Sequence, residues 1–404
     1  MICSACNDTA LESLCSLGSI PLCDDFRGSP TEAMAVPMYK LSPLICPRCR
    51  HIELQEKPDC SSVYKNYIYR SRHSIDLKAH FDSYVDAAIT LFDDLAGHPP
   101  KTVLDVGCND GLLLERFGNK LRDAVLHGID PSPAIFDVPE NVTAHHTLFT
   151  GGYIDEAKLS SQFDIVCCNN TLANISNVQE FLERLGSCLA NTGLLIIETG
   201  YGPATLLNSV WDMVNHEHFH YFSLDSMLAL GRRCGLKLIR TEIQKTKGGS
   251  VRAFFVKNQS RVRSSAGNID SLLAFESALF VNRDSFVESV RLRLEGAREN
   301  CKAVKSSSSR IVHFGASAGS TILVHALGYS DIAGCIVDDN RDRHGLYLPG
   351  SCARVVGIDE VDIDHEVTVV VWSWRFVQEI MERHPSLGRS REVIYGNTFR
   401  PVSR

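Results

Sequence analysis

The pattern of apolar and polar positions predicts alternating strands and helices through the middle of the chain. Residues 79–92, AHFDSYVDAAITLF, have the apolar spacing of an amphipathic helix. After the turn GHPP, the stretch KTVLDVGCNDGLLLERF predicts a buried strand, a glycine turn and a helix. Further strands are predicted at FDIVCCNN and GLLIIETG, with the helical VQEFLERLGSCLA between them. This alternation is typical of a doubly wound α/β sheet.

The C-terminal part of the chain repeats this pattern after a helical stretch. Residues 270–305 predict one long amphipathic helix or two in succession, ending at the linker-like KSSSSR. The stretch RIVHFGASAGSTILVHAL then predicts strand, glycine turn and helix, followed by strands at GCIVDD and VTVVVWSW. Such a turn either faces a nucleotide or only packs the strand against the helix, and both interpretations stay open. We expect three domains, at 1–75, 76–268 and 269–404.

Composition and charge narrow the class of protein. The 404 residues are 44% hydrophobic, enough for two or three separate cores. The formal charge of −7 comes from scattered acids, with no basic stripe, so we expect a small-molecule partner and no nucleic acid. No apolar run approaches the roughly 18 residues that cross a bilayer, and MICSACND does not resemble a signal peptide. We expect a cytoplasmic protein without a membrane partner, and no disulfides among its fifteen cysteines.

Two C-x2-C pairs open the sequence. Cys3 and Cys6 form the first, and Cys46 and Cys49 form the second. Two such pairs can supply the four thiolates of a closed, tetrahedral zinc site, which would be structural because it leaves no open position. The alternative is four unrelated buried thiols, and Cys15 and Cys23 are substitutes if one ligand is misassigned. We expect a small four-cysteine zinc domain at the N-terminus.

The first glycine turn carries the pattern D-x-G-x3-G. Glycines allow a ligand close to the backbone, and amides at the following helix start face it. An acid at the end of the next strand is placed to hold two ribose hydroxyls. The dinucleotide pattern G-x-G-x-x-G is absent, and an acid two residues before the first glycine suits the cationic methionine end of S-adenosylmethionine. We therefore predict a class I methyltransferase domain, disfavour a nicotinamide oxidoreductase, and assign the donor to Asp105, Gly107, Asn109, Gly111, Asp130 and Asn170.

The stretch VNHEHFHYFS contains three histidines at alternate positions. On a strand, His216, His218 and His220 would share one face and could hold a metal ion. The alternatives are a structural histidine in a domain interface and proton transfer, for which an imidazole has a suitable pKa. A proton next to a ketone is weakly acidic and needs such a base.

The order of these parts resembles the S-adenosylmethionine-dependent C-methyltransferases that act on nucleotide-linked 4-keto-deoxysugars. The resemblance runs over nearly the whole chain, through LGSIPLCDDF, YIYRSRHS, LDVGCNDGLLL, NHEHFHYFSLDSM, GGSVRAFF and GASAGSTIL. It implies a zinc-binding N-terminal domain, a central methyltransferase domain and a C-terminal Rossmann-like domain that helps hold the nucleotide sugar. The implied reaction removes a proton from carbon 3, beside the 4-ketone, and the enolate then attacks the methyl group of the donor.

The resemblance also implies roles for single residues. His218 would be the general base, with Glu217 and His216 beside it in the active site. The candidate residues lining the acceptor site are Tyr69, with its neighbour Tyr67, Ser71, His80, Asn174, Asn215 and Ser250.

The chain departs from the pattern of this family at three places. Asn215 stands where the family has tyrosine, Asn174 where it has histidine, and Gly319 with Ser320 where it has Lys-Gly. All three positions lie on the acceptor side. Two alternatives therefore stay open: the same architecture acting on a non-sugar natural-product acceptor, and a donor-binding protein without turnover. We expect a monomer or a dimer.

Overall fold

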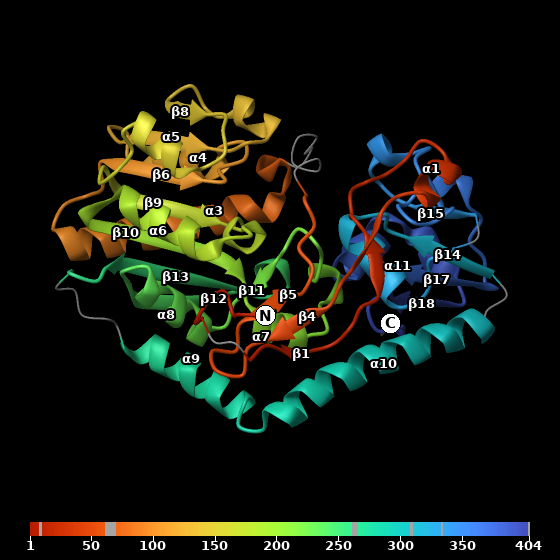
Figure 1. Cartoon of the computed structure of the whole chain (residues 1–404). Coiled ribbons are helices and arrows are strands. Elements are labelled where there is room, and N and C mark those ends of the chain that lie inside the picture. Colours follow the sequence, from red (N-terminus) through yellow and green to blue (C-terminus); the bar gives the residue numbers. More distant parts are fainter. Residues whose placement is uncertain (8–9, 61–69, 261–265, 308–309, 333, 403–404) are drawn as a thin grey trace.

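The computed structural model describes residues 1–7, 10–60, 70–260, 266–307, 310–332 and 334–402. Two α/β parts stand side by side, with the N-terminal strands between them (Figure 1). Two consecutive helices, α9 (Ala266–Leu279) and α10 (Arg283–Ser307), run beneath both parts. The prediction of helix over residues 270–305 is confirmed as two helices. Within the described part of the chain, no helix combines the length and the apolar character that a membrane span needs.

The central part is built on a seven-stranded sheet of order β12-β13-β10-β9-β6-β7-β8. Strands β6 to β10 are parallel, and β13 pairs antiparallel with both β10 and β12. The strands are β6 (Thr102–Val106), β7 (Val125–Ile129), β8 (Val142–His145), β9 (Phe163–Asn169), β10 (Leu189–Gly200), β12 (Leu236–Gln244) and β13 (Ser250–Lys257). The helices are α3 (Ile75–Ala96), α4 (Leu112–Lys120), α5 (Gly151–Glu156), α6 (Val178–Cys188), α7 (Gly202–Leu207) and α8 (Leu224–Arg233).

Both faces of this sheet are covered by helices. In β6, Val103 packs on one face with Phe92 and Phe117, and Leu104 packs on the other with Phe181. Because successive side chains of a strand point to opposite faces, a strand covered on both sides must be apolar throughout. The strand order reverses at β6, which lies between β7 and β9, and such a switch point opens a crevice at the carboxyl ends of the strands.

The C-terminal part is a second α/β unit. Its six strands have the order β16-β15-β14-β17-β18-β19 and are parallel except for the last pair. The strands are β14 (Arg310–Phe314), β15 (Cys335–Val337), β16 (Arg354–Val356), β17 (Val367–Val371), β18 (Glu392–Tyr395) and β19 (Arg400–Pro401). The helices are α11 (Ala318–Ala326) and α12 (Val377–Arg383). The predicted strand, glycine turn and helix are therefore present.

The N-terminal segment shares a sheet with the central part and a core with both larger parts. Its strands β1 (Glu12–Ser13), β4 (Pro43–Ile45) and β5 (Ile52–Leu54) are completed by β11 (His220–Tyr221). A second antiparallel pair joins β2 (Ser19–Pro21) to β3 (Met38–Lys40), with α1 (Pro30–Met34) in the connection between them, and β2 packs against α11. One core cluster contains Ile20, Trp211 and Ile322, one residue from each part.

Candidate active site

A cavity of about 230 Å³ opens at the carboxyl ends of β6, β7 and β9. We call it the donor cavity, after the predicted donor residues in its wall. Five of the six predicted donor residues line it, and the sixth, Gly111, begins the helix α4 beside it. Its apolar wall consists of Leu77, Phe81, Leu113, Ile129, Phe149 and Phe181. The cavity therefore lies at the switch point, where this fold binds its ligands.

The glycines of the turn are required by its geometry. Gly107 has φ +82, and a Cβ there would lie 2.0 Å from Oγ1 of Thr171. Gly111 has φ +73, and its Cβ would lie 2.9 Å from Cγ1 of Val138. Neither position accepts a side chain without strain and collision. Asn109, between them, also has a positive φ of 52.

Two carboxylates face this cavity and have different environments. Both carboxylate oxygens of Asp130 accept hydrogen bonds from the protein. Oδ2 accepts from the amide of Asn109 at 2.9 Å, and Oδ1 accepts from the amide and hydroxyl of Ser132 at 2.8 and 2.5 Å. Asp105 is 3% exposed, and its buried Oδ1 has no hydrogen-bond partner in the described residues. Burial, with a contribution from Asp130, raises the pKa of Asp105 to about 8. A buried carboxylate with an unsatisfied oxygen fits a cationic ligand group, as the methionine end of the donor provides.

The three histidines are not on one face of a strand, so that interpretation was wrong. Only His220 belongs to a strand, β11. The side chain of Asn215 accepts from the amides of Glu217 and His218 at 3.0 and 3.1 Å, which turns the chain before the strand begins. In the described residues the three imidazoles form no common metal-binding group.

His218 has two neighbours at Nδ1. The carbonyl oxygen of Met213 lies 3.2 Å from it, and the side-chain amide nitrogen of Asn215, Nδ2, lies 3.3 Å from it. The first contact needs a proton on Nδ1 and leaves the lone pair on Nε2, whereas the second needs the opposite tautomer. The Met213 carbonyl also accepts from the hydroxyl of Tyr221 at 3.2 Å.

His218 lines a second cavity of about 20 Å³, which has room for about one water molecule. Asn170 belongs to the walls of both cavities, so the small cavity lined by His218 adjoins the donor cavity. Thr199 also lines the small cavity, and its buried Oγ1 has no hydrogen-bond partner in the part of the chain that the structure describes.

The candidate acceptor residues do not all gather around these cavities. Ser71 lines the donor cavity and donates through its amide to Oδ1 of Asn109 at 3.0 Å. Asn174 lines the same cavity, and its buried Oδ1 has no partner in the described residues. Tyr67 and Tyr69 lie outside the described residues.

Five further candidates line neither cavity, and one of them is Asn215, in the turn described above. His80 contacts Oε1 of Glu198 at 2.6 Å, and the hydroxyl of Ser250 donates to the carbonyl of Thr246 at 3.1 Å. His216 is fully buried at the edge of the Tyr39 ring, and burial lowers its pKa. Glu217 is partly exposed in the turn. These positions stay predictions as far as the acceptor is concerned.

Two buried side chains of opposite charge lie next to His80 and were not among the predicted site residues. Arg252, 1% exposed, donates from Nε to Oε2 of Glu198 at 2.8 Å and lies over the ring of Tyr84. Burial would raise the pKa of Glu198, but the bonds from His80 and Arg252 hold it below its usual range. A charged residue inside each apolar strand, Glu198 in GLLIIETG and Arg252 in SVRAFFVK, was the available signal.

Strand β11 takes part in a buried pair of histidines that was not predicted from the sequence. His51 Nε2 lies 3.0 Å from His220 Nδ1, and Glu53 is close enough that the three could hold a metal ion. Glu53 is already bound by the amide and hydroxyl of Ser4 and by Lys57. The ring–ring hydrogen bond is the simpler explanation of this contact.

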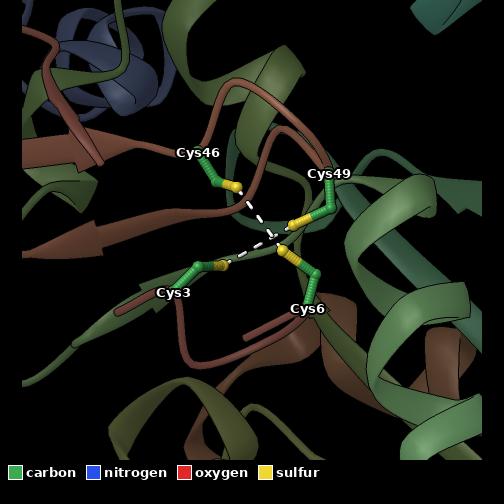
Figure 2. Close-up of side chains that lie close together, drawn as sticks. All are labelled: Cys3, Cys6, Cys46 and Cys49. Carbon is green, nitrogen blue, oxygen red and sulfur yellow. Dashed lines mark hydrogen bonds between the residues drawn. The ribbon is translucent and has the colours of Figure 1, made fainter. Parts of the chain in front are cut away.

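The four predicted cysteines converge (Figure 2). Cys3 and Cys49 have their sulfurs 3.6 Å apart, as do Cys6 and Cys46, and all four sulfurs lie within 4.8 Å of one another. Four thiolates at 2.3 Å from one zinc ion would be about 3.75 Å apart, so the set fits a tetrahedral site. The substitutes, Cys15 and Cys23, belong to a separate apolar core.

Comparison with known proteins gives two family matches. Residues 80–241 match the methyltransferase domain, and residues 245–393 match the C-methyltransferase C-terminal domain. The chain is 24% identical over 394 residues to C-methyltransferase NovU of Streptomyces niveus, covering 94% of this chain and 91% of that protein. It is 28% identical over 137 residues to an uncharacterized methyltransferase of Mycobacterium bovis, covering 34% of this chain and 65% of that protein.

Among solved structures, the plantazolicin methyltransferase BpumL in complex with SAH matches with a TM-score of 0.38 and 15% identity, over 50% of this chain and 92% of that one. The class of this protein follows from the NovU similarity over nearly the full length, the two consecutive family matches and the donor cavity at the switch point. The chain is an S-adenosylmethionine-dependent methyltransferase in which a methyltransferase domain is followed by a C-methyltransferase C-terminal domain.

Proposed function

We propose that this enzyme methylates the carbon next to the ketone of a nucleotide-linked keto-deoxysugar, with His218 as the general base. The observation that carries the role of His218 is the shared wall: Asn170 lines both the donor cavity and the small cavity of His218. The two cavities therefore adjoin each other, and a reaction that involves base, acceptor and donor requires such closeness. The keto-sugar acceptor rests on the sequence motifs that resemble the sugar-modifying members of the family.

The chemistry assigns a task to each group. When bound, the donor supplies a methyl group on a sulfonium, whose sulfur keeps the C–S electron pair and leaves neutral. His218 takes the proton from the carbon through Nε2 while Nδ1–H stays on the Met213 carbonyl. The amides of Asn170 and Asn174 can donate to the enolate oxygen but cannot exchange protons near neutral pH. Glu217, in the same turn, is proposed as an acceptor contact.

The four-cysteine site is proposed to hold a structural zinc ion. The cluster joins two loops of the N-terminal segment, and the carbonyl of Cys49 accepts from the hydroxyl of Ser223 at 2.8 Å. Arg233 donates to the carbonyls of Ser4 and Ala5 at 3.1 and 2.9 Å. The metal would therefore fix the start of β5. This strand pairs with β11, which directly follows residues 215–219, here called the histidine loop.

The base assignment is tested with His218→Ala. Loss of a general base lowers turnover by about 10²–10⁴-fold, while affinity for S-adenosylhomocysteine should stay within about 2-fold because His218 does not line the donor cavity. His98→Ala, at an exposed histidine, is the matched control. Near-normal turnover of His218→Ala would show that the base assignment is wrong.

The acceptor class is tested separately by calorimetry. Thymidine diphosphate and guanosine diphosphate are titrated into the protein loaded with S-adenosylhomocysteine. Binding of either nucleotide supports an acceptor linked to a nucleotide, and the preferred base narrows it. If only the donor product binds, the acceptor lies outside the nucleotide sugars.

A further inference from the structure

A short turn of the central part, η4 (Trp211–Met213), comes directly before the histidine loop in the chain and contacts the C-terminal part. Its middle residue, Asp212, is 5% exposed. Oδ1 of Asp212 accepts from the indole nitrogen of Trp374 at 3.1 Å, and Oδ2 pairs with Nη1 of Arg375 at 2.7 Å. Trp374 and Arg375 follow β17 in the C-terminal sheet. A side chain of the central part is thus held by two side chains of the C-terminal part.

The contact is closely packed as well as polar. Helix α11 lies against η4, and a Cβ at Gly319 would come within 2.9 Å of the Cβ of Asp212. Burial raises the pKa of Asp212, and the Arg375 guanidinium opposes that shift. Removing either side chain would leave the other one buried or half-buried without its partner, which is costly.

The next residue along the chain connects this contact to His218. The carbonyl of Met213 follows Asp212 directly, and it is the oxygen that lies 3.2 Å from Nδ1 of His218. The side-chain amide nitrogen of Asn215, Nδ2, lies 3.3 Å from the same Nδ1 and favours the other tautomer. The position of the Met213 carbonyl therefore bears on which ring nitrogen of His218 carries the proton.

We propose that Asp212 is a positioning residue, which ties Met213 to the C-terminal part and so keeps the lone pair of His218 on Nε2. This inference rests on the proposed function, because the tautomer matters for catalysis only if His218 is the base. The C-terminal part then contributes to proton transfer through the contact of Trp374 and Arg375 with Asp212. The contact forms between residues 212 and 374–375, which are far apart in the sequence, so it makes the two sheets one catalytic unit.

The tautomer of His218 is measured directly in the full-length protein. Nitrogen-15 NMR of the imidazoles distinguishes Nδ1–H from Nε2–H, and the His218→Ala spectrum identifies the signals. We expect Nδ1–H in the unmodified protein and a shift toward Nε2–H in Asp212→Ala. Turnover should fall by about 10–100-fold with donor affinity unchanged, because a misplaced group near the reacting atoms costs rate more than donor binding.

Three further variants make the test specific. Asp212→Asn keeps an acceptor for Trp374 and should retain an intermediate rate. Arg375→Ala should shift the tautomer in the same direction, and it serves as the test if Asp212→Ala does not fold. Arg383→Ala, which removes an exposed ion pair with Asp339 in the same part of the chain, should leave the tautomer and the rate unchanged.

The outcomes separate this inference from the proposed function. If His218→Ala is inactive but folded Asp212→Ala and Arg375→Ala keep the original tautomer and rate, the positioning role is refuted and the base assignment stands. If His218→Ala stays active, the base assignment fails whatever the tautomer. A tautomer shift with a matching loss of rate supports both.

Discussion

The raised pKa of Asp105 predicts that donor binding releases a proton. In the free protein the carboxyl is buried beside Asp130, with a pKa of about 8, so it is protonated below that pH. The methionine end of the donor brings an ammonium group and a sulfonium, which favour the ionised carboxylate. Binding should therefore release about one proton at pH 6.5, where the ammonium of the donor is fully charged.

The same linkage sets the pH dependence of affinity. If only the carboxylate form binds tightly, affinity must rise with pH up to about 8 and fall as pH decreases. A pKa of about 8 gives a loss of roughly 30-fold in donor affinity between pH 7 and pH 5.5. The sign follows from the free protein holding the proton that the complex lacks.

Calorimetry in buffers of different ionisation enthalpy counts the released proton. Asp105→Asn is the matched variant, since an amide resembles the protonated carboxyl in shape and cannot titrate in this range. It should bind the donor more weakly, release no proton and show a flat affinity between pH 5.5 and 7. A proton count near zero in the unmodified protein, or an equal pH slope in Asp105→Asn, would refute the reasoning.

Three other predictions concern the donor turn, the metal site and a buried glutamate. Gly107→Ala should weaken donor binding at least ~10-fold in a calorimetric titration, because its Cβ would collide with Thr171, whereas Gly296→Ala in open space should leave it unchanged. Cys46→Ser should lower the zinc content measured by atomic emission and the thermal midpoint together; a folded, metal-free variant would contradict the four-thiolate site. Glu276 accepts at 2.7 Å from Tyr201 and at 2.6 Å from the amide of Leu224, so Glu276→Ala should cost about 1–3 kcal/mol by thermal unfolding. Exposed Glu288→Ala should cost almost nothing, and equal losses in the two variants would show that the hydrogen bonds of Glu276 do not stabilise the fold.

Local spacing predicted the parts of the site that depend on local geometry. The residues from Asp105 to Gly111 form the donor turn because a positive φ and a nearby side chain require glycine, and this requirement is visible in the sequence. The two C-x2-C pairs likewise form compact loops, and only their convergence needed the fold. The donor cavity and the cysteine cluster were therefore within reach of sequence reasoning.

Other parts depend on contacts between distant residues. Period-two spacing suggested a strand for His216 to His220, but the side chain of Asn215 turns the backbone by local hydrogen bonds that compete with strand pairing. The ion pair of Glu198 with Arg252 joins neighbouring strands, and Asp212 reaches Arg375 across two parts of the chain. No spacing within either stretch predicts such pairs.

The pairing of β5 with β11 has a consequence for biosynthesis. Glu53 lies opposite His220 in that ladder, so the N-terminal sheet cannot be completed until residue 220 has been made. At ordinary translation speeds of roughly 5–20 residues per second, the edge of β5 waits ~8–33 s for its partner. An unpaired edge invites association with other chains during that interval. The strand that follows the histidine loop therefore also closes a sheet edge that stays unpaired during synthesis.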